Sequence, residues 1–299
     1  MNDKRVLDFL IIGAQKAGTT SLFKYLQAHP QLYLLPEKEA SFFCHDERFS
    51  RGWDWYLREF LSDAPAGRLW GKASPDYMAD PRVPQRMCDL LPGVKLITLL
   101  RDPIERAYSQ YLMSFRRGLD QRTFEQAVRD LLAQDALAEA RGRPTPINSY
   151  IVRGEYARIL AGFYEHFASS QVAVFFTDEL ACDPGAVFRQ ICEFLSIDSD
   201  FVPPDLGVRY HKGGAKRRWP WMDRMKQGSE VRALWRLLPA RRRRVVSYWF
   251  HQWRSIPDDD DAPVSVTEAT RDLLVQHYAH EMRHLPALIG REIPWATWK

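Results

Sequence analysis

Asp-Phe-Leu-Ile-Ile-Gly-Ala-Gln-Lys-Ala-Gly-Thr-Thr-Ser, residues 8–21, is the stretch that decides the fold. Its apolar run at 9–12 predicts a buried strand, Gly13 a turn, and Gly18 with the three hydroxyl residues after it the start of a helix. Such a junction binds anions, because backbone N–H groups and the positive end of the helix dipole meet there. Gly13 and Gly18 keep the spacing of the pattern G-x-x-x-x-G-K-[ST], but Thr19 replaces its lysine and Lys16 supplies the charge from inside the loop. The stretch therefore predicts a phosphate-binding loop that is not that of an ATPase.

Strands and helices alternate along the rest of the chain. We expect strands at 9–12, 69–72, 94–100 and 172–176, and helices at 20–28, 103–115, 123–140, 148–167, 184–195 and 267–289. This order predicts an α/β fold, a single domain over residues 1–299 with a central parallel sheet flanked by helices. Asp102 before Pro103 is a strong helix-start signal. Because Arg101-Asp102 and the phosphate loop both follow strands, we expect them to face one crevice at the carboxyl ends of the sheet.

Composition places the chain among ordinary globular proteins, with 45% hydrophobic and 27% charged residues in 299. The net charge is only +4, but residues 209–254 hold fourteen Lys or Arg against two acids. Such a segment indicates either an anionic partner or a solvated helical face. Residues 224–263 are expected to form a basic, mostly helical excursion from the domain. The four cysteines lack metal-type spacing, and with no secretory signal and no long apolar segment we expect a cytoplasmic, bacterial protein without stable membrane insertion.

Three segments together identify a family. They are residues 11–21 around Lys16, the stretch Arg101-Asp-Pro-Ile-Glu-Arg-Ala-Tyr-Ser-Gln-Tyr111, and the stretch Gly71-Lys-Ala-Ser-Pro-Asp-Tyr77. In this order the chain resembles the sulfotransferases that use PAPS (3′-phosphoadenosine 5′-phosphosulfate), in the branch with the heparan sulfate sulfotransferases and their bacterial relatives. The resemblance implies that the first segment is a P-loop-like loop for the 5′-phosphosulfate, with Lys16, Ala17, Gly18, Thr19, Thr20 and Ser21 as its ligands. It further implies Arg101 and Ser109 at the 3′-phosphate, and Lys72, Ser74 and Tyr77 beside the acceptor.

The catalytic base is also taken from the resemblance. The stretch Glu37-Lys-Glu-Ala-Ser-Phe-Phe43 is similar to the family segment in which a glutamate precedes two phenylalanines, and this selects Glu39. Glu37 remains an alternative, whereas His45 is a lone histidine near aromatic residues and is expected to be structural. Lys16 and Lys72 would stabilise the transition state of in-line transfer. The alternative is that Lys72 has no role in catalysis and is an exposed lysine at the end of a strand.

A last match concerns the nucleotide-covering loop of the family. Lys216-Arg-Arg-Trp-Pro220 is similar to its Lys-Gly-Arg-x-x-Pro element, but the glycine is missing and Gly213-Gly214 lie just upstream. The register is therefore open by one or two residues. Arg217 is the preferred ligand, followed by Lys216.

Two other functions compete with this interpretation. A kinase or nucleoside triphosphatase shares the strand–loop–helix, and a non-enzymatic protein could bind nucleic acid or acidic lipid through residues 209–254. For the favoured function we expect PAPS as co-substrate, no metal, no nucleic-acid partner, and an acceptor that is a carbohydrate, a glycolipid or a secondary metabolite. Arg116 and Arg117 are further acceptor candidates, and Arg101 has the alternative of an ion pair with Asp102 or Glu105. The acceptor itself and the oligomeric state stay open.

Overall fold

The computed structural model describes residues 6–35, 41–144, 148–210, 215–217, 255–257 and 266–298. The chain divides into two compact units, one of Met1–His211 with Ser265–Lys299 and one of Lys212–Val264. In the second unit two short strands, β6 (Ala215–Arg217) and β7 (Ser255–Pro257), pair antiparallel. Apart from β7, the expected excursion at 224–263 lies outside the described residues.

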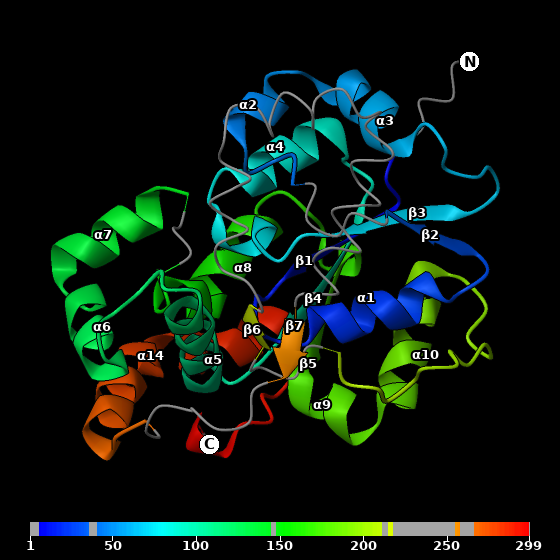
Figure 1. Ribbon diagram of the computed structural model, residues 1–299. Helices are drawn as coiled ribbons and strands as arrows, with labels where there is room; N and C mark the ends of the chain where they lie inside the picture. The colour runs from blue at the N-terminus through cyan, green and yellow to red at the C-terminus, as the bar shows by residue number, and fades with distance from the viewer. Residues whose placement is uncertain are drawn as a thin grey trace. The chain divides into compact units, whose positions relative to one another are not determined.

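A five-stranded parallel sheet forms the centre of the first unit, in the order β2-β3-β1-β4-β5 (Figure 1). Four strands agree with the sequence to within one residue at each end: β1 (Phe9–Gly13), β3 (Leu69–Ala73), β4 (Lys95–Leu100) and β5 (Val172–Phe176). The edge strand β2 (Leu32–Leu34) was not predicted, because three residues are too few to show a strand period. β1 is buried along its whole length between β3 and β4. The α/β class and the parallel sheet are thus confirmed.

Helices cover both faces of the sheet. α1 (Thr19–Gln27) and α10 (Pro184–Leu195) lie on one side, and the ring of His29, just past α1, contacts Phe188 of α10 (Figure 1). α4 (Val83–Leu90) and α8 (Tyr156–Tyr164) lie on the other, where the Cys88 thiol donates to the carbonyl of His166. The remaining helices are α2 (Asp46–Phe49), α3 (Trp53–Leu61), α5 (Pro103–Arg116), α6 (Phe124–Leu131), α7 (Gln134–Gly142), α9 (Thr177–Cys182) and α14 (Glu268–Ile289). Single 3₁₀ turns are η1 (Tyr77–Ala79), η2 (Val152–Gly154), η3 (Ser169–Gln171) and η4 (Ala296–Trp298).

Two helix predictions were wrong at their boundaries. The stretch 123–140 is not one helix but two, because Ala133 adopts an extended backbone between α6, which has a buried face, and α7, which has no buried residue. The stretch 148–167 becomes helical only at Tyr156, after the 3₁₀ turn η2. In that turn a Cβ added to Gly154 would lie 2.7 Å from the Tyr278 hydroxyl, so α14 presses on the backbone there. A tertiary contact thus accompanies the late start of α8.

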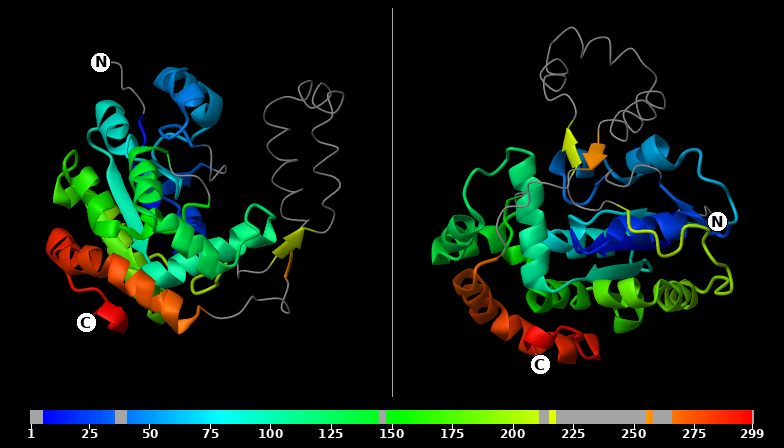
Figure 2. Two further views of the ribbon diagram at one scale, coloured as in Figure 1. Left: turned by 90° about the vertical axis from the view of Figure 1, so that its left-hand side faces the viewer. Right: turned by 60° about the horizontal axis from the view of Figure 1, so that its bottom comes forward.

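The C-terminal part of the chain returns to the carboxyl edge of the sheet (Figure 2). α14 packs against α8 and ends at Gly290, whose φ of 68° favours glycine. Beyond it, the indole N–H of Trp295 donates to Asp178 at 2.9 Å, and that of Trp298 donates to Asp102 at 3.0 Å. These bonds fasten the ends of β4 and β5. None of the described helices is both long enough and apolar enough to cross a membrane.

Candidate active site

The predicted phosphate loop connects the end of β1 to α1. Gly18 has a φ of 93° and Lys16 a φ of 72°, so the loop contains two left-handed residues, and only the first is a glycine. At the start of the loop, a Cβ on Gly13 would lie 2.6 Å from the Cβ of Met78, which explains the glycine there. The loop is tied to the sheet by the amide of Ala14, which donates to the carbonyl of Leu99 in β4 at 2.8 Å.

The amino end of α1 carries no acidic cap. Its cap residue is Gly18, and its first turn contains Thr19, Thr20 and Ser21 but no Asp or Glu. Ser21 has a structural contact, since its hydroxyl accepts a bond from the amide of Tyr210 at 3.0 Å. The cap and first turn of this nine-residue helix thus supply no carboxylate of their own to the positive end of its dipole, a feature typical of anion sites.

Arg101 lies beside this loop, at the end of the neighbouring strand β4. Its Nη1 donates to the carbonyl of Lys16 at 3.4 Å, and its own carbonyl accepts from the Tyr156 hydroxyl at 2.7 Å. The expected proximity of the two segments is thus confirmed. They meet where the chain leaves β1 toward one edge of the sheet and β4 toward the other, the switch point at which such sheets bind ligands.

The expected alternative partner of Arg101 is also present. Arg101 Nη2 lies 3.3 Å from Glu105 Oε2, and both side chains are partly exposed, at 31% and 47%. An exposed pair of this kind contributes about 0–1 kcal/mol, so it leaves the guanidinium available to a stronger anion. Ser109 lies one turn beyond Glu105 on the same face of α5 and is half-buried. The face of α5 that carries Glu105 therefore also carries the second residue predicted at the 3′-phosphate.

Positive charge is concentrated at Lys16. Burial first, and then the charges of Arg117, Arg101 and Arg116, together lower the pKa of this ammonium from 10.5 to about 8. Like charges held together are costly in the ligand-free protein, and an anion placed among them removes that cost. Arg116 and Arg117, expected only as acceptor candidates, thus also act on the field at the phosphate loop.

The third predicted segment runs from the end of β3 into η1. Lys72 is fully buried and pairs in register with Leu10 of β1, so the interpretation as an exposed lysine is wrong. Its Nζ lies 5.7 Å from the centre of the Tyr56 ring. Ser74 Oγ lies 2.6 Å from Ser41 Oγ, and the buried Tyr77 hydroxyl accepts from the amide of Phe42 at 2.9 Å. Burial raises the pKa of Tyr77, which therefore stays protonated.

Several predicted residues cannot be placed in this site. Glu37 and Glu39 lie outside the described residues, although Ser41, which contacts Ser74, follows Glu39 by two positions. Lys216 and Arg217 form the backbone of β6 in the second unit, and their side chains are not described. His45 is exposed at the start of α2.

Two residues of the site were missed in the sequence. The hydroxyl of Thr177, directly after β5, lies 2.7 Å from the carbonyl oxygen of Ala17 and 3.0 Å from that of Leu100. Arg153 in η2 donates to Asp76 at 2.8 Å and to Gln15 at 3.4 Å. A hydroxyl residue directly after the expected strand at 172–176 was a visible signal for Thr177. The sequence contained no comparable signal for Arg153.

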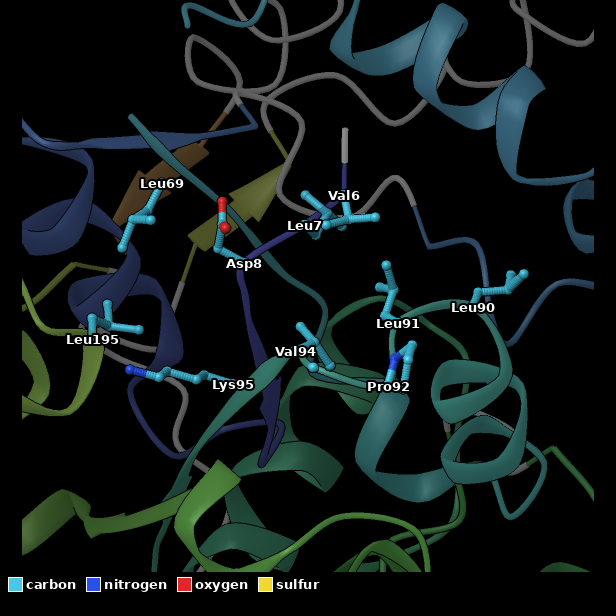
Figure 3. Close-up of a pocket in the computed structure, with 11 residues that line it drawn as sticks. Val6, Leu7, Asp8, Leu69, Leu90, Leu91, Pro92, Val94, Lys95 and Leu195 are labelled. Atoms are coloured by element: carbon cyan, nitrogen blue, oxygen red, sulfur yellow. The ribbon is translucent and has the colours of Figure 1, made fainter. Parts of the chain in front are cut away.

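A cavity of about 390 Å³ opens at the other end of the sheet (Figure 3). Its lining is mainly apolar and comes from the start of β1, from Leu69 and from residues 90–95, with Asp8 and Lys95 as its charged groups. Because it lies at the amino ends of parallel strands, it is not where this sheet type binds its substrates. In the described part of the chain, no three His, Cys, Asp or Glu side chains gather as a metal ion would require.

Known proteins resemble this chain in sequence and in fold. The sulfotransferase domain family matches residues 7–205. A sulfotransferase from Alicyclobacillus acidocaldarius has a similar structure, with 26% identity, coverage of 97% of this chain and 98% of that one, and a TM-score of 0.67.

Curated relatives match over shorter stretches. The membrane-associated sulfotransferase kil1 of Dictyostelium discoideum is 39% identical over 111 residues, which are 36% of this chain and 23% of that protein. The human bifunctional heparan sulfate N-deacetylase/N-sulfotransferase 3 is 29% identical over 199 residues, 64% of this chain and 22% of that protein. The chain thus spans less than a quarter of the length of either relative. Since the family match extends over well more than half of the chain and includes the phosphate loop, the protein belongs to the sulfotransferase domain family.

Proposed function

We propose that the protein transfers the sulfuryl group of PAPS to a hydroxyl or amine of an acceptor. The observation that carries the proposal is the contact between Arg101 and the carbonyl of Lys16, which joins two cationic sites at neighbouring strand ends. PAPS carries a phosphosulfate at one end and a phosphate at the other, so it needs two such sites side by side. Family membership supports the same donor.

At the donor, Lys16 and the amino end of α1 (residues 17–21) hold the 5′-phosphosulfate, and Arg101 with Ser109 holds the 3′-phosphate. Lys16 carries its charge where a leaving phosphate would gain negative charge as the bond to sulfur breaks. Lys216 and Arg217 are further ligands of the nucleotide in this proposal. Residues 1–299 would then act as one sulfotransferase domain, with the stretch 224–263 added to it.

On the acceptor side, Glu39 takes the proton of the attacking group, and Lys72 stabilises the charge that develops during transfer. Two contacts support this placement: Ser41, two residues after Glu39, touches Ser74, and Phe42 is bonded to Tyr77. Ser74 and Tyr77 thus lie against the segment that follows the base. We assign Tyr77 to holding that segment, because its hydroxyl is buried and already accepts a hydrogen bond.

The acceptor is a glycan, a glycolipid or a small metabolite. The human relative is named as an N-sulfotransferase of heparan sulfate, and an N-sulfotransferase places the sulfuryl group on a nitrogen, here an amine of a sugar polymer. For this chain, the similarity supports an acceptor hydroxyl or amine on a carbohydrate-like molecule. In this proposal the acceptor passes Arg116 and Arg117 as it approaches Lys16. No nucleic acid and no metal takes part in the proposed reaction.

The test is the melting temperature with PAP, the desulfated product, and separately with ATP, each with and without magnesium. At a hundredfold excess over its dissociation constant a ligand stabilises by about 2.7 kcal/mol, which for this chain length is a shift of roughly 4 °C. We expect the shift with PAP alone, unchanged by a chelator and largely lost in Arg101→Ala. A shift only with magnesium and ATP would make the protein a phosphotransferase instead.

A further inference from the structure

One arginine outside the predicted motifs connects the two loops of the site. Arg153 belongs to η2, and its side chain is only 7% exposed. Its Nη1 donates to Asp76 Oδ1 at 2.8 Å and to Gln15 Oε1 at 3.4 Å. A guanidinium Nη carries two N–H groups, so one nitrogen can serve both partners.

One partner belongs to the segment proposed to bind the donor, and the other belongs to the segment proposed to lie beside the acceptor. Gln15 directly precedes Lys16 in the phosphate loop, and Asp76 lies between Ser74 and Tyr77 in the acceptor segment. A gap of only about 10 Å³ separates the loops, and its lining is Ala14, Gln15, Pro75, Met78, Ala79 and Arg153. That is room for one water at most, so the two loops lie close together beside Arg153.

The backbone that carries Arg153 is held firmly in place. The carbonyl of Ile151 accepts from the Tyr278 hydroxyl of α14 at 2.8 Å, and Gly154 has no room for a side chain. Next to it, the fully buried Glu155 is bonded to Arg141, Arg158 and His277.

The charge of Glu155 is stable in this setting. Burial alone would raise its pKa, but hydrogen bonds from His277 and Arg141 and the charge of Arg158 bring it down to about 2. The carboxylate thus stays ionised and the network stays closed at ordinary pH. Arg153 therefore projects from a rigid support toward two loops.

We propose that Arg153 is a positioning residue that couples the phosphate loop to the acceptor segment, so that occupation of the first loop restrains the second. Transfer rates depend steeply on the distance between reacting groups, and a bridge between the two loops sets that distance. Arginine suits the task because its fork of N–H groups reaches two acceptors in fixed geometry, which the point charge of lysine does not. The proposal rests on the proposed function only where it names the ligand of the phosphate loop.

The first arm of the test needs no ligand. Hydrogen exchange by mass spectrometry would be compared for Arg153→Gln, Asp76→Asn and the unaltered protein, in peptides covering 14–21 and 74–79. Loss of a bond to a charged group should speed exchange about tenfold in both peptides of both variants, since either change breaks the bridge. The matched control is Arg291→Gln, because Arg291 bonds Glu179 and the carbonyl of Val174 but neither loop. Faster exchange in only one peptide, or equal effects in the control, would overturn the bridge.

The second arm adds PAP at saturating concentration. In the unaltered protein we expect slower exchange in both peptides, although the proposed PAP ligands lie only in the first. In Arg153→Gln, PAP should still bind within about threefold of its normal affinity and should still protect peptide 14–21. Its protection of peptide 74–79 should be lost. Arg153→Lys should restore part of that protection. Undiminished protection of 74–79 in Arg153→Gln would refute the coupling. Failure of PAP to bind the unaltered protein would instead refute the proposed function, and the ligand-free arm would still decide the bridge.

Discussion

α1 and α5 begin at neighbouring strand ends, and their first turns are completed in opposite ways. In α5 the Asp102 carboxylate caps the helix, accepting from the amides of Ile104 and Glu105 at 2.9 and 3.1 Å. In α1 the cap is Gly18, and no acid follows it in the first turn. One helix has a carboxylate cap, while the other has neither a side-chain cap nor an acid in its first turn. In the proposed function, the anion at α5 is therefore held by a side chain, Arg101, and the anion at α1 by the backbone and Lys16.

The largest effect should come from the open helix end. Lys16→Ala removes the charge at α1, and we expect PAP to bind about 30- to 160-fold more weakly, as for a lost charge-assisted bond of about 2–3 kcal/mol. Stability should not fall, because the ammonium lies among like charges. Titration calorimetry measures the affinity, with Lys24→Ala in the last turn of the same helix as the control. An unchanged affinity would show that α1 does not hold the nucleotide.

At the amino end of α5, which Asp102 caps, a substitution should lower stability more than it lowers PAP affinity. Asp102→Ala removes the acceptor of two amides and of the Trp298 indole, and we expect the free energy of unfolding to fall by about 2 kcal/mol, or roughly 3 °C in melting temperature. PAP affinity should fall much less than in Lys16→Ala. Denaturant titration gives the stability, and Asp102→Asn, which keeps one carbonyl acceptor, should lose less. If Asp102→Ala weakened PAP binding as much as Lys16→Ala, the contrast between the two helices would be refuted.

A smaller effect should appear with pH. PAP binds the protonated form of Lys16, whose pKa is about 8, so its dissociation constant should rise about tenfold between pH 7 and pH 9. Arg117→Gln removes one of the like charges and should shift this rise to higher pH. The stability of the ligand-free protein changes with pH in the opposite direction to PAP affinity. Because the unfolded chain binds the Lys16 proton more tightly, stability rises from about pH 8 toward 10.5. A flat affinity over this range would exclude Lys16 as the group that titrates.

Much of the fold was readable from the sequence because its signals are local. The strand at 9–12, the turn at Gly13 and the helix after Gly18 depend on residues next to one another, and so does the cap at Asp102. The failures lie where distant contacts override the local pattern, as at Gly154 under Tyr278, which delays the start of α8. Glu39, Lys216 and Arg217 stay predictions.

The sequence by itself determined the strand, loop and helix of residues 8–21, the α/β alternation, the capped start of α5 and the family. Only the tertiary structure decided that Arg101 meets the carbonyl of Lys16, that Lys72 is buried, and that Arg153 bridges Gln15 and Asp76. The physical reason is the range of the interactions. Hydrogen bonding and periodicity within an element join residues a few positions apart, whereas Arg153 lies 138 positions from Gln15 and reaches it only because the sheet and α14 pack as they do.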